Sequence, residues 1–133
     1  MKAKVQDNPR AEVAILLLAK VPELRDRRIR MRVVGMCMFR RTWCNNIFID
    51  FLARHPLGPV RGAGTALLWY VARVASALDA AAIWGETTQN SVGYYSKVLR
   101  KKDMTDLLYI ARNEYEAFCV ATERLQAEAM SNE

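Results

Sequence analysis

The residues with the clearest chemical potential lie in the stretch HPLGPVRGAGTALLWYV, residues 55–71. It places two glycines, Gly62 and Gly64, beside the cation Arg61 and the hydroxyl of Thr65. Glycines let a backbone approach phosphate oxygens closely, and free N–H groups at the start of a helix attract anions. The pattern therefore indicates a phosphate-binding loop, although a purely structural turn could have the same composition.

Two common phosphate-binding motifs do not fit this loop. No Lys followed by Ser or Thr comes after the glycines, which excludes the P-loop. The dinucleotide fingerprint would require a third glycine and a downstream acid after a parallel strand. A different kind of phosphate-binding loop is needed.

The elements around the loop predict an α/β domain with a mixed sheet. Residues 47–53 are almost continuously apolar, which is typical of a central strand covered on both faces, and Asn45 and Asn46 supply a turn before them. After the loop, the spacing of apolar residues predicts a helix over 67–78, a strand over 80–84, a helix from 90 or 91 to 99, and a strand over 107–110.

The two ends of the chain are predicted from caps and periodicity. Asn8 and Pro9 precede a helical pattern over residues 11–21, which Pro22 ends or bends. Residues 28–38 alternate with a period of two and are interrupted at Gly35, as in two strands or one bent strand. A capping box formed by Asn113 and Glu116 predicts a terminal helix. A strand over residues 116–121 is the alternative. One face of the predicted helix carries Tyr115, Phe118, Cys119, Thr122 and Leu125.

Length and composition indicate one domain over residues 1–133, with 52% apolar and 26% charged residues. The longest apolar run, Val13 to Ala19, is far shorter than the ~20 residues of a membrane span. We expect no membrane association and a cytoplasmic location. Cys37, Cys44 and Cys119 lack CxxC spacing, so neither disulfides nor a metal site is expected.

The net charge of +6 favours an anionic ligand or partner. Nucleic acid and a polyphosphate cofactor both fit such a charge, although runs of charge are often simply solvated. The excess is concentrated in Arg25, Arg27, Arg28, Arg30, Arg32, Arg40 and Arg41, with a second cluster at Arg100, Lys101 and Lys102.

Two motifs in the chain resemble those of the GNAT superfamily of N-acetyltransferases. The family signature is Gln or Arg, two residues, Gly, one residue, then Gly or Ala, and Arg61, Gly64 and Ala66 match it in register. The stretch IFIDFLARHPLGPV is similar to the family's fourth strand and its exit. SVGYYSKVL resembles its second motif, an aromatic pair followed one residue later by Lys. Together the matches cover residues 47–99, about 40% of the chain.

The resemblance implies a GNAT-like, splayed mixed sheet flanked by helices, with acetyl-CoA as co-substrate and no metal. An amine would attack the thioester directly in a ternary complex, without a covalent enzyme intermediate. Ser91, in the polar run 87–91, is expected to line the coenzyme arm. The pyrophosphate is expected on the amides of Arg61, Gly62, Ala63, Gly64, Thr65 and Ala66, and the pantetheine arm along Leu52, Ala53 and Arg54.

Direct attack needs a base for the amine and an acid for the departing thiolate. Tyr95 aligns with the family tyrosine that protonates coenzyme A, and it is expected to contact the cofactor as well. The base stays open between Glu86, just past a predicted strand, Asp50, an acid inside an apolar strand, and His55.

Departures from the family pattern leave the acceptor open. The region that usually forms a strand and two helices over the acceptor site is compressed into residues 1–27. Leu99 replaces a usual glycine, and a helix is predicted where a final hairpin strand is common. A small-molecule amine, a peptide N-terminus and a protein lysine all remain candidates, for a monomer or homodimer. The alternatives are a phage-like, nucleic-acid-modifying relative, suggested by the ETTQ to YY segment and the basic charge, and a non-catalytic acyl-CoA-binding module.

Overall fold

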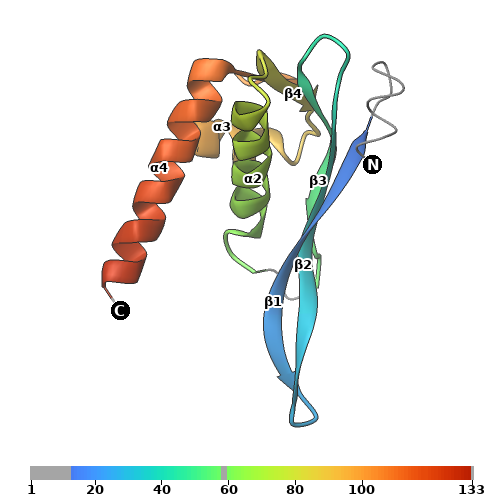
Figure 1. Ribbon diagram of the computed structural model, residues 1–133, viewed down its shortest axis with the longest axis vertical. Helices are drawn as coiled ribbons and strands as arrows, with labels where there is room; N and C mark the ends of the chain where they lie inside the picture. Colours follow the sequence, from blue (N-terminus) through green and yellow to red (C-terminus); the bar gives the residue numbers. More distant parts are fainter. Residues whose placement is uncertain (1–12, 58–59, 133) are drawn as a thin grey trace.

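The computed structural model describes residues 13–57 and 60–132, which form a sheet and three helices. The sheet has five strands in the order β1-β2-β3-β4-β5 (Figure 1). The strands are β1 (Ala14–Arg25), β2 (Arg28–Arg41), β3 (Ile47–Arg54), β4 (Ala82–Glu86) and β5 (Leu107–Ala111). The helices are α2 (Ala63–Ala77), α3 (Val92–Leu99) and α4 (Arg112–Ser131).

The sheet is mixed because one of its strand pairs is parallel. β3 and β4 run parallel and are connected through α2, while the other neighbouring strands are antiparallel. A parallel pair needs such a crossover, since a tight turn can connect only antiparallel strands. The mixed α/β sheet predicted from the sequence is confirmed, with element boundaries shifted by a few residues.

The three helices lie on one side of the sheet, and no described element covers the other side (Figure 1). The core forms where Phe39, Ile47 and Ile49 of the sheet meet Leu68 of α2 and Tyr115 of α4. The prediction that residues 47–53 are covered on both faces is wrong, because Phe51 keeps 39% of its surface exposed. An apolar run indicates a buried strand but not how many layers cover it.

The helix predicted over residues 11–21 is wrong where the structure describes it, since β1 begins at Ala14; residues 8–12, with the predicted cap, lie outside the described residues. Ile15 and Leu17 point toward the core while Leu16 and Leu18 are exposed, which is the alternation of a strand. A short apolar run fits either element, and the antiparallel partner β2 decides the outcome. Pro22 is tolerated because β1 is an edge strand.

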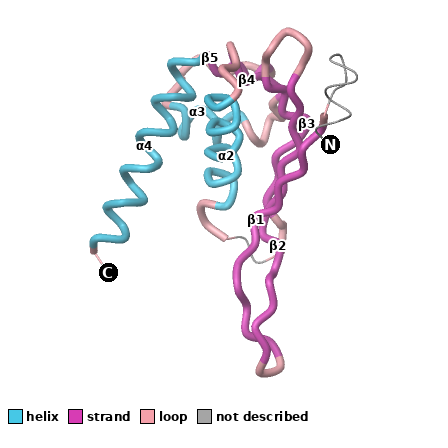
Figure 2. The backbone as a smooth tube through the Cα atoms, in the orientation of Figure 1, coloured by secondary structure: helices cyan, strands magenta, loops and turns pink. Residues whose placement is uncertain are grey.

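The β1–β2 hairpin extends beyond the helices as a two-stranded arm (Figure 2). β2 is one strand with an irregularity, because its pairing with β1 passes from Ala19–Gly35 to Lys20–Val33. Residues 20–33 form the part beyond this irregularity, and we call them the arm. Residues 22–31 are exposed throughout.

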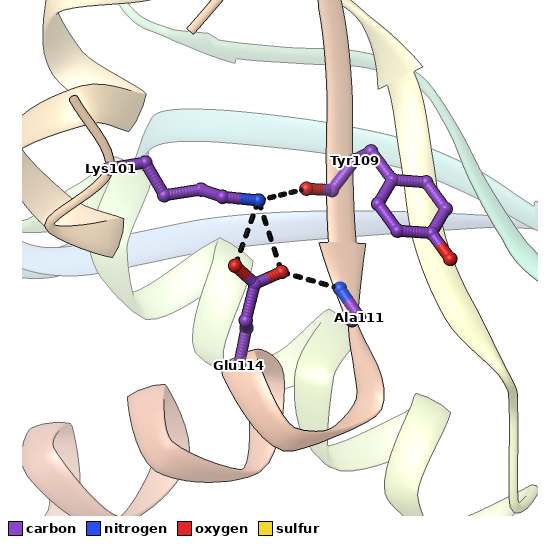
Figure 3. A network of polar contacts seen from close by, with 4 residues as sticks. All are labelled: Lys101, Tyr109, Ala111 and Glu114. Atoms are coloured by element: carbon purple, nitrogen blue, oxygen red, sulfur yellow. Dashed lines mark hydrogen bonds and ion pairs between the residues drawn. The ribbon is translucent and has the colours of Figure 1, made fainter. Parts of the chain in front are cut away.

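A polar network connects α3, β5 and the start of α4 (Figure 3). Lys101 Nζ donates to the Tyr109 carbonyl at 2.6 Å and lies 2.9 Å from Glu114 Oε1. Glu114 Oε2 accepts the Ala111 N–H at 2.7 Å. Burial would raise the pKa of Glu114, but the hydrogen bonds from Lys101 and Ala111 and the Lys101 charge outweigh burial and lower it. Lys101, which the sequence placed in a surface basic cluster, is therefore a structural residue.

The terminal helix is confirmed, but its predicted cap is wrong. α4 begins at Arg112, and Glu114 satisfies the first free N–H instead of the Asn113 and Glu116 pair. Tyr115, Phe118 and Cys119 are buried as expected, and the Tyr115 hydroxyl donates to the Ala80 carbonyl at 2.6 Å; Leu125 is 67% exposed. In the described part of the chain, no helix is both long and apolar enough to cross a membrane.

Candidate functional site

The parallel strands β3 and β4 diverge halfway along β3. They pair only from Ile47–Ile83 to Ile49–Gly85, whereas β3 continues to Arg54 beside β2 alone. A Cβ on Gly85 would lie 2.9 Å from the Ile49 carbonyl oxygen, so glycine permits the last close contact before the strands separate. The splayed sheet expected from the family resemblance is confirmed.

A β-bulge at Asp50 changes which side chains of β3 face the helices. The β2–β3 register passes from Phe39–Ile49 to Met38–Phe51, so Asp50 is the extra residue. Ile49 faces the core before the bulge and Leu52 faces the helices after it, a change of parity that a bulge produces. Asp50 itself lies 3.3 Å from Arg40 Nε in an ion pair.

A cleft of about 300 Å³ lies between the second half of β3, the start of α2 and α3. It gathers several residues that the sequence assigned to cofactor binding: Leu52, Arg54, Gly62, Gly64, Thr65, Ser91 and Tyr95. Other residues of the predicted set do not line it: Ala53, Arg61, Ala63 and Ala66. Residues absent from the predicted set also contribute: Val60, Asn90 and Tyr94.

The start of α2 presents backbone N–H groups to this cleft. Gly62 precedes the helix with a φ of 86°, a left-handed conformation that glycine adopts without strain. The Ala66 N–H donates to the Gly62 carbonyl at 2.9 Å, whereas the N–H groups of Gly64 and Thr65 have no protein acceptor among the described residues. The first turn contains no acidic side chain, so its positive dipole end is left for an anion.

Tyr94 packs against the first turn of α2. A Cβ on Gly64 would lie 3.1 Å from the Tyr94 hydroxyl oxygen, and that oxygen is 3.3 Å from Thr65 Oγ1. Burial raises the pKa of Tyr94, and the hydrogen bond with Thr65 partly offsets this. The sequence placed Tyr94 in the aromatic pair but assigned it no cofactor contact, because its position depends on how α3 crosses α2.

Tyr95 is the more deeply buried tyrosine, with only 5% of its surface exposed. Burial raises its pKa well above the ordinary value for tyrosine, and the nearby Tyr94 and Cys37 raise it further. Its ring contacts that of Tyr94 edge to face, with centroids 5.2 Å apart. The Tyr95 hydroxyl therefore keeps its proton across the neutral range and can act as a donor in the cleft.

None of the three candidate bases lines the cleft. Glu86 ends β4 and is exposed. In the register of the sheet it lies opposite Leu107, on the uncovered face. Asp50 is paired with Arg40. His55 is exposed, and its Nδ1 lies 2.9 Å from the Leu57 carbonyl oxygen in a local turn.

The polar run 87–91 divides into structural and cleft-lining residues. Thr87 is buried, and its hydroxyl donates to the Thr105 carbonyl at 2.7 Å. The Thr88 N–H donates to the Ser91 hydroxyl oxygen at 2.9 Å, which shapes the turn before α3. Only Asn90 and Ser91 reach the cleft.

Neither a family model nor a curated protein matches the chain, but solved structures do. A Bacillus cereus acetyltransferase is 17% identical, with a TM-score of 0.52 over 72% of this chain and 70% of that one. Tetrahymena GCN5 is 22% identical, with a TM-score of 0.46, and covers 59% of this chain. A putative streptothricin acetyltransferase from Bacillus anthracis, in complex with acetyl coenzyme A, is 15% identical, with a TM-score of 0.45 over 73% of this chain and 79% of that one.

The chain spans about half the length of the Tetrahymena GCN5 structure, 48%. The similarity to the Bacillus cereus enzyme shows that the chain has the fold of GNAT acetyltransferases. The GNAT-like fold expected from the two sequence motifs is confirmed.

Proposed function

We propose that the chain is an acetyltransferase of the GNAT superfamily that uses acetyl-CoA to acetylate a primary amine. The observation that carries this proposal is the cleft itself. The free N–H groups at the start of α2 and the tyrosine pair of α3 meet there beside the point where β3 and β4 separate. An anion site, a proton donor and a gap in the sheet thus lie together.

The donor would bind along two backbone surfaces. The N–H groups of Gly64 and Thr65, at the positive end of the α2 dipole, suit the pyrophosphate. Beyond Ile49, the edge of β3 that faces β4 makes no ladder hydrogen bonds. The peptide groups around Leu52 can therefore bond the amides of a pantetheine arm that enters the gap in the sheet.

Acetyl transfer in this cleft would be a direct attack in a ternary complex. The amine nitrogen bonds to the thioester carbonyl carbon, the carbon–sulfur bond breaks, and the thiolate takes a proton from the Tyr95 hydroxyl. Tyr95 suits this role because its raised pKa keeps it protonated. The amine proton would pass to water, because Glu86 lies on the uncovered face of the sheet, Asp50 is paired with Arg40 and His55 is held in a local turn.

Two measurements on the full chain test this function. Calorimetry with acetyl-CoA should show binding, and a thiol-release assay should show turnover with at least one member of a panel of small amines, peptide N-termini and lysine peptides. Absence of coenzyme A binding would contradict the proposal. Binding of acetyl-CoA without turnover on any acceptor would instead support the non-catalytic acyl-CoA-binding module.

A further inference from the structure

The arm has a basic face and an apolar face. In the strand register, Arg25 lies opposite Arg28, Glu23 opposite Arg30, and Val21 opposite Arg32. Because side chains alternate along a strand, these pairs share one face, which we call the basic face. The pairs between them occupy the other face: Leu24–Ile29, Pro22–Met31 and Lys20–Val33.

Three of the four arginines on the basic face make no contribution through side-chain polar contacts to the described fold. Arg25, Arg28 and Arg30 are exposed and make no side-chain hydrogen bond or ion pair with any described residue. Arg32 lies 3.7 Å from Glu23 Oε1, at the base of the arm. The arm projects beyond the helices, so its basic face remains accessible (Figure 1).

Two arginines at the tip of the arm lie where their charges disfavour folding of the hairpin. Arg25 and Arg28 are directly opposite each other, and like charges in this position destabilise a hairpin. The turn between them has positive φ at both central residues, 51° at Asp26 and 61° at Arg27. Such turns favour glycine at the second central position. Local choices that oppose folding are expected where a residue serves a binding function.

We infer that the basic face of the arm binds the phosphate backbone of duplex DNA. A two-stranded ribbon fits the major groove, which is about 12 Å wide. Arg28, Arg30 and Arg32 recur every second residue, which spaces their backbones about 6.7 Å apart. Each guanidinium group can make two hydrogen bonds to a phosphate. This binding does not depend on acetyl transfer in the cleft.

Other anionic partners fit the arm less well. Its arginines and its exposed apolar side chains, such as Leu24 and Ile29, lie on opposite faces. A flat anionic bilayer could therefore meet only one of the two sets. Duplex RNA has a deep, narrow major groove that a two-stranded ribbon does not enter.

The experiment measures binding of the full chain to a labelled, mixed-sequence 20-bp DNA duplex by fluorescence anisotropy between 50 and 300 mM salt. With up to four arginines on phosphates, the logarithm of the association constant should fall against the logarithm of salt with a slope of roughly −3.5. The variant R25Q/R28Q/R30Q should bind at least tenfold more weakly at 50 mM salt, with a slope shallower by about 2.7. A matched control removes three other exposed cations, K97Q/K102Q/R124Q, and should change both values little.

Folding of both triple variants is checked by circular dichroism and thermal melting. The arm variant removes the Arg25–Arg28 repulsion, so its melting temperature should be unchanged or higher. The inference is overturned if the two triple variants lose DNA affinity equally or if binding is insensitive to salt. Equal affinity for duplex RNA, or binding to vesicles containing 30% phosphatidylserine without DNA binding, would overturn it as well.

Discussion

The cleft at the start of α2 and the arm are the two regions that we propose to bind anions, and they would do so by different physical means. The cleft offers N–H groups, a helix dipole and buried tyrosines within a packed core. The arm offers exposed guanidinium groups on a hairpin outside that core. Binding in the cleft should therefore depend on geometry, whereas binding by the arm should depend on charge and be screened by salt. Five predictions test this contrast.

The largest effect is expected at Tyr95, where the cleft's chemistry would reside. In Tyr95→Phe, kcat should fall about 100-fold or more, because proton transfer by a positioned group contributes that much. Affinity for acetyl-CoA should change little. Since the pKa of Tyr95 is raised, ionisation of its hydroxyl should cause no loss of rate up to about pH 10.

The matched control for Tyr95 is Tyr70→Phe on the exposed side of α2, which should keep the wild-type rate. An equal loss in both variants would point to a general structural effect. An unchanged rate in Tyr95→Phe alone would assign the acid to another group.

A side chain at Gly64 should close the cleft. In Gly64→Leu, the new Cβ would already lie 3.1 Å from the Tyr94 hydroxyl oxygen, and its branches would enter the space beside Leu52. We expect about a 100-fold loss of acetyl-CoA affinity by calorimetry, since overpacking typically costs 1–3 kcal/mol. DNA binding should be unaffected. Gly93→Leu, whose Cβ meets no atom within 4 Å, is the control, and a similar loss there would contradict the steric explanation.

The salt concentration should affect ligand binding by the arm much more than ligand binding in the cleft. Raising it from 50 to 200 mM should weaken DNA binding about 100-fold if roughly four phosphate contacts are involved. The affinity for acetyl-CoA should fall by only about fivefold, because the N–H groups of the cleft are partly buried and therefore less screened. An equal loss of affinity for DNA and for acetyl-CoA would contradict the view that the cleft binds by geometry and the arm by charge.

Two left-handed backbone positions provide a reciprocal test of stability. Gly62, at the cleft, has a φ of 86° with open space around it, and Arg27, in the arm, has a φ of 61°. Gly62→Ala should lower the free energy of unfolding by about 1 kcal/mol, and Arg27→Gly should raise it by up to about 1 kcal/mol, both measured in urea. If Gly62→Ala raised the free energy of unfolding and Arg27→Gly lowered it, the explanation by left-handed backbone conformation would be contradicted.

The smallest effect concerns the Lys101–Glu114 network, which supports the cleft from the far end of α3. Lys101→Met should lower stability at pH 7 by about 0.5–1 kcal/mol, because the pair is partly exposed and screened. The pKa of Glu114 is lower in the folded state than in the unfolded state. The stabilisation by the ion pair is therefore complete above the unfolded-state pKa and is lost as the pH falls through the folded-state pKa. The difference in stability between the two proteins should therefore begin to shrink only below the ordinary pKa of glutamate, about 4.3, and should continue to shrink as the pH falls further. A constant difference down to pH 2 would contradict this origin.

The sequence predicted the half of the molecule in which short-range signals agree. From β3 to β5, the apolar runs, the glycines of the loop and the helical spacing of α2 point to the observed elements. The first strand was mistaken for a helix because Val13 to Ala19 is apolar throughout, and a run of that length fits both periods. Only pairing with β2 shows that the segment is a strand and not a helix, and such pairing depends on residues far apart in the sequence.

In the candidate site, too, some residues could be predicted from short-range sequence signals and others only from the tertiary structure. Residue type and spacing indicate Gly62 and Gly64, the family resemblance implies Arg54 and Tyr95, and the structure brings all four to one cleft. Tyr94 belongs to the predicted aromatic pair, but its place in the cleft depends on how α3 packs against α2. Asp50 was noticed as an acid in an apolar strand, but its bulge and its ion pair with Arg40 require the register of β2.

The sequence by itself determined the glycine-rich start of α2, the tyrosine pair and the concentration of arginines before residue 33, because conformational freedom, periodicity and charge are properties of neighbouring residues. Tertiary structure decided where β3 and β4 separate, which side chains of β3 turn toward the helices, and that the arginines form one face of a projecting hairpin. Strand pairing and bulges join residues far apart in the chain, and their register is set by the packing of the whole sheet.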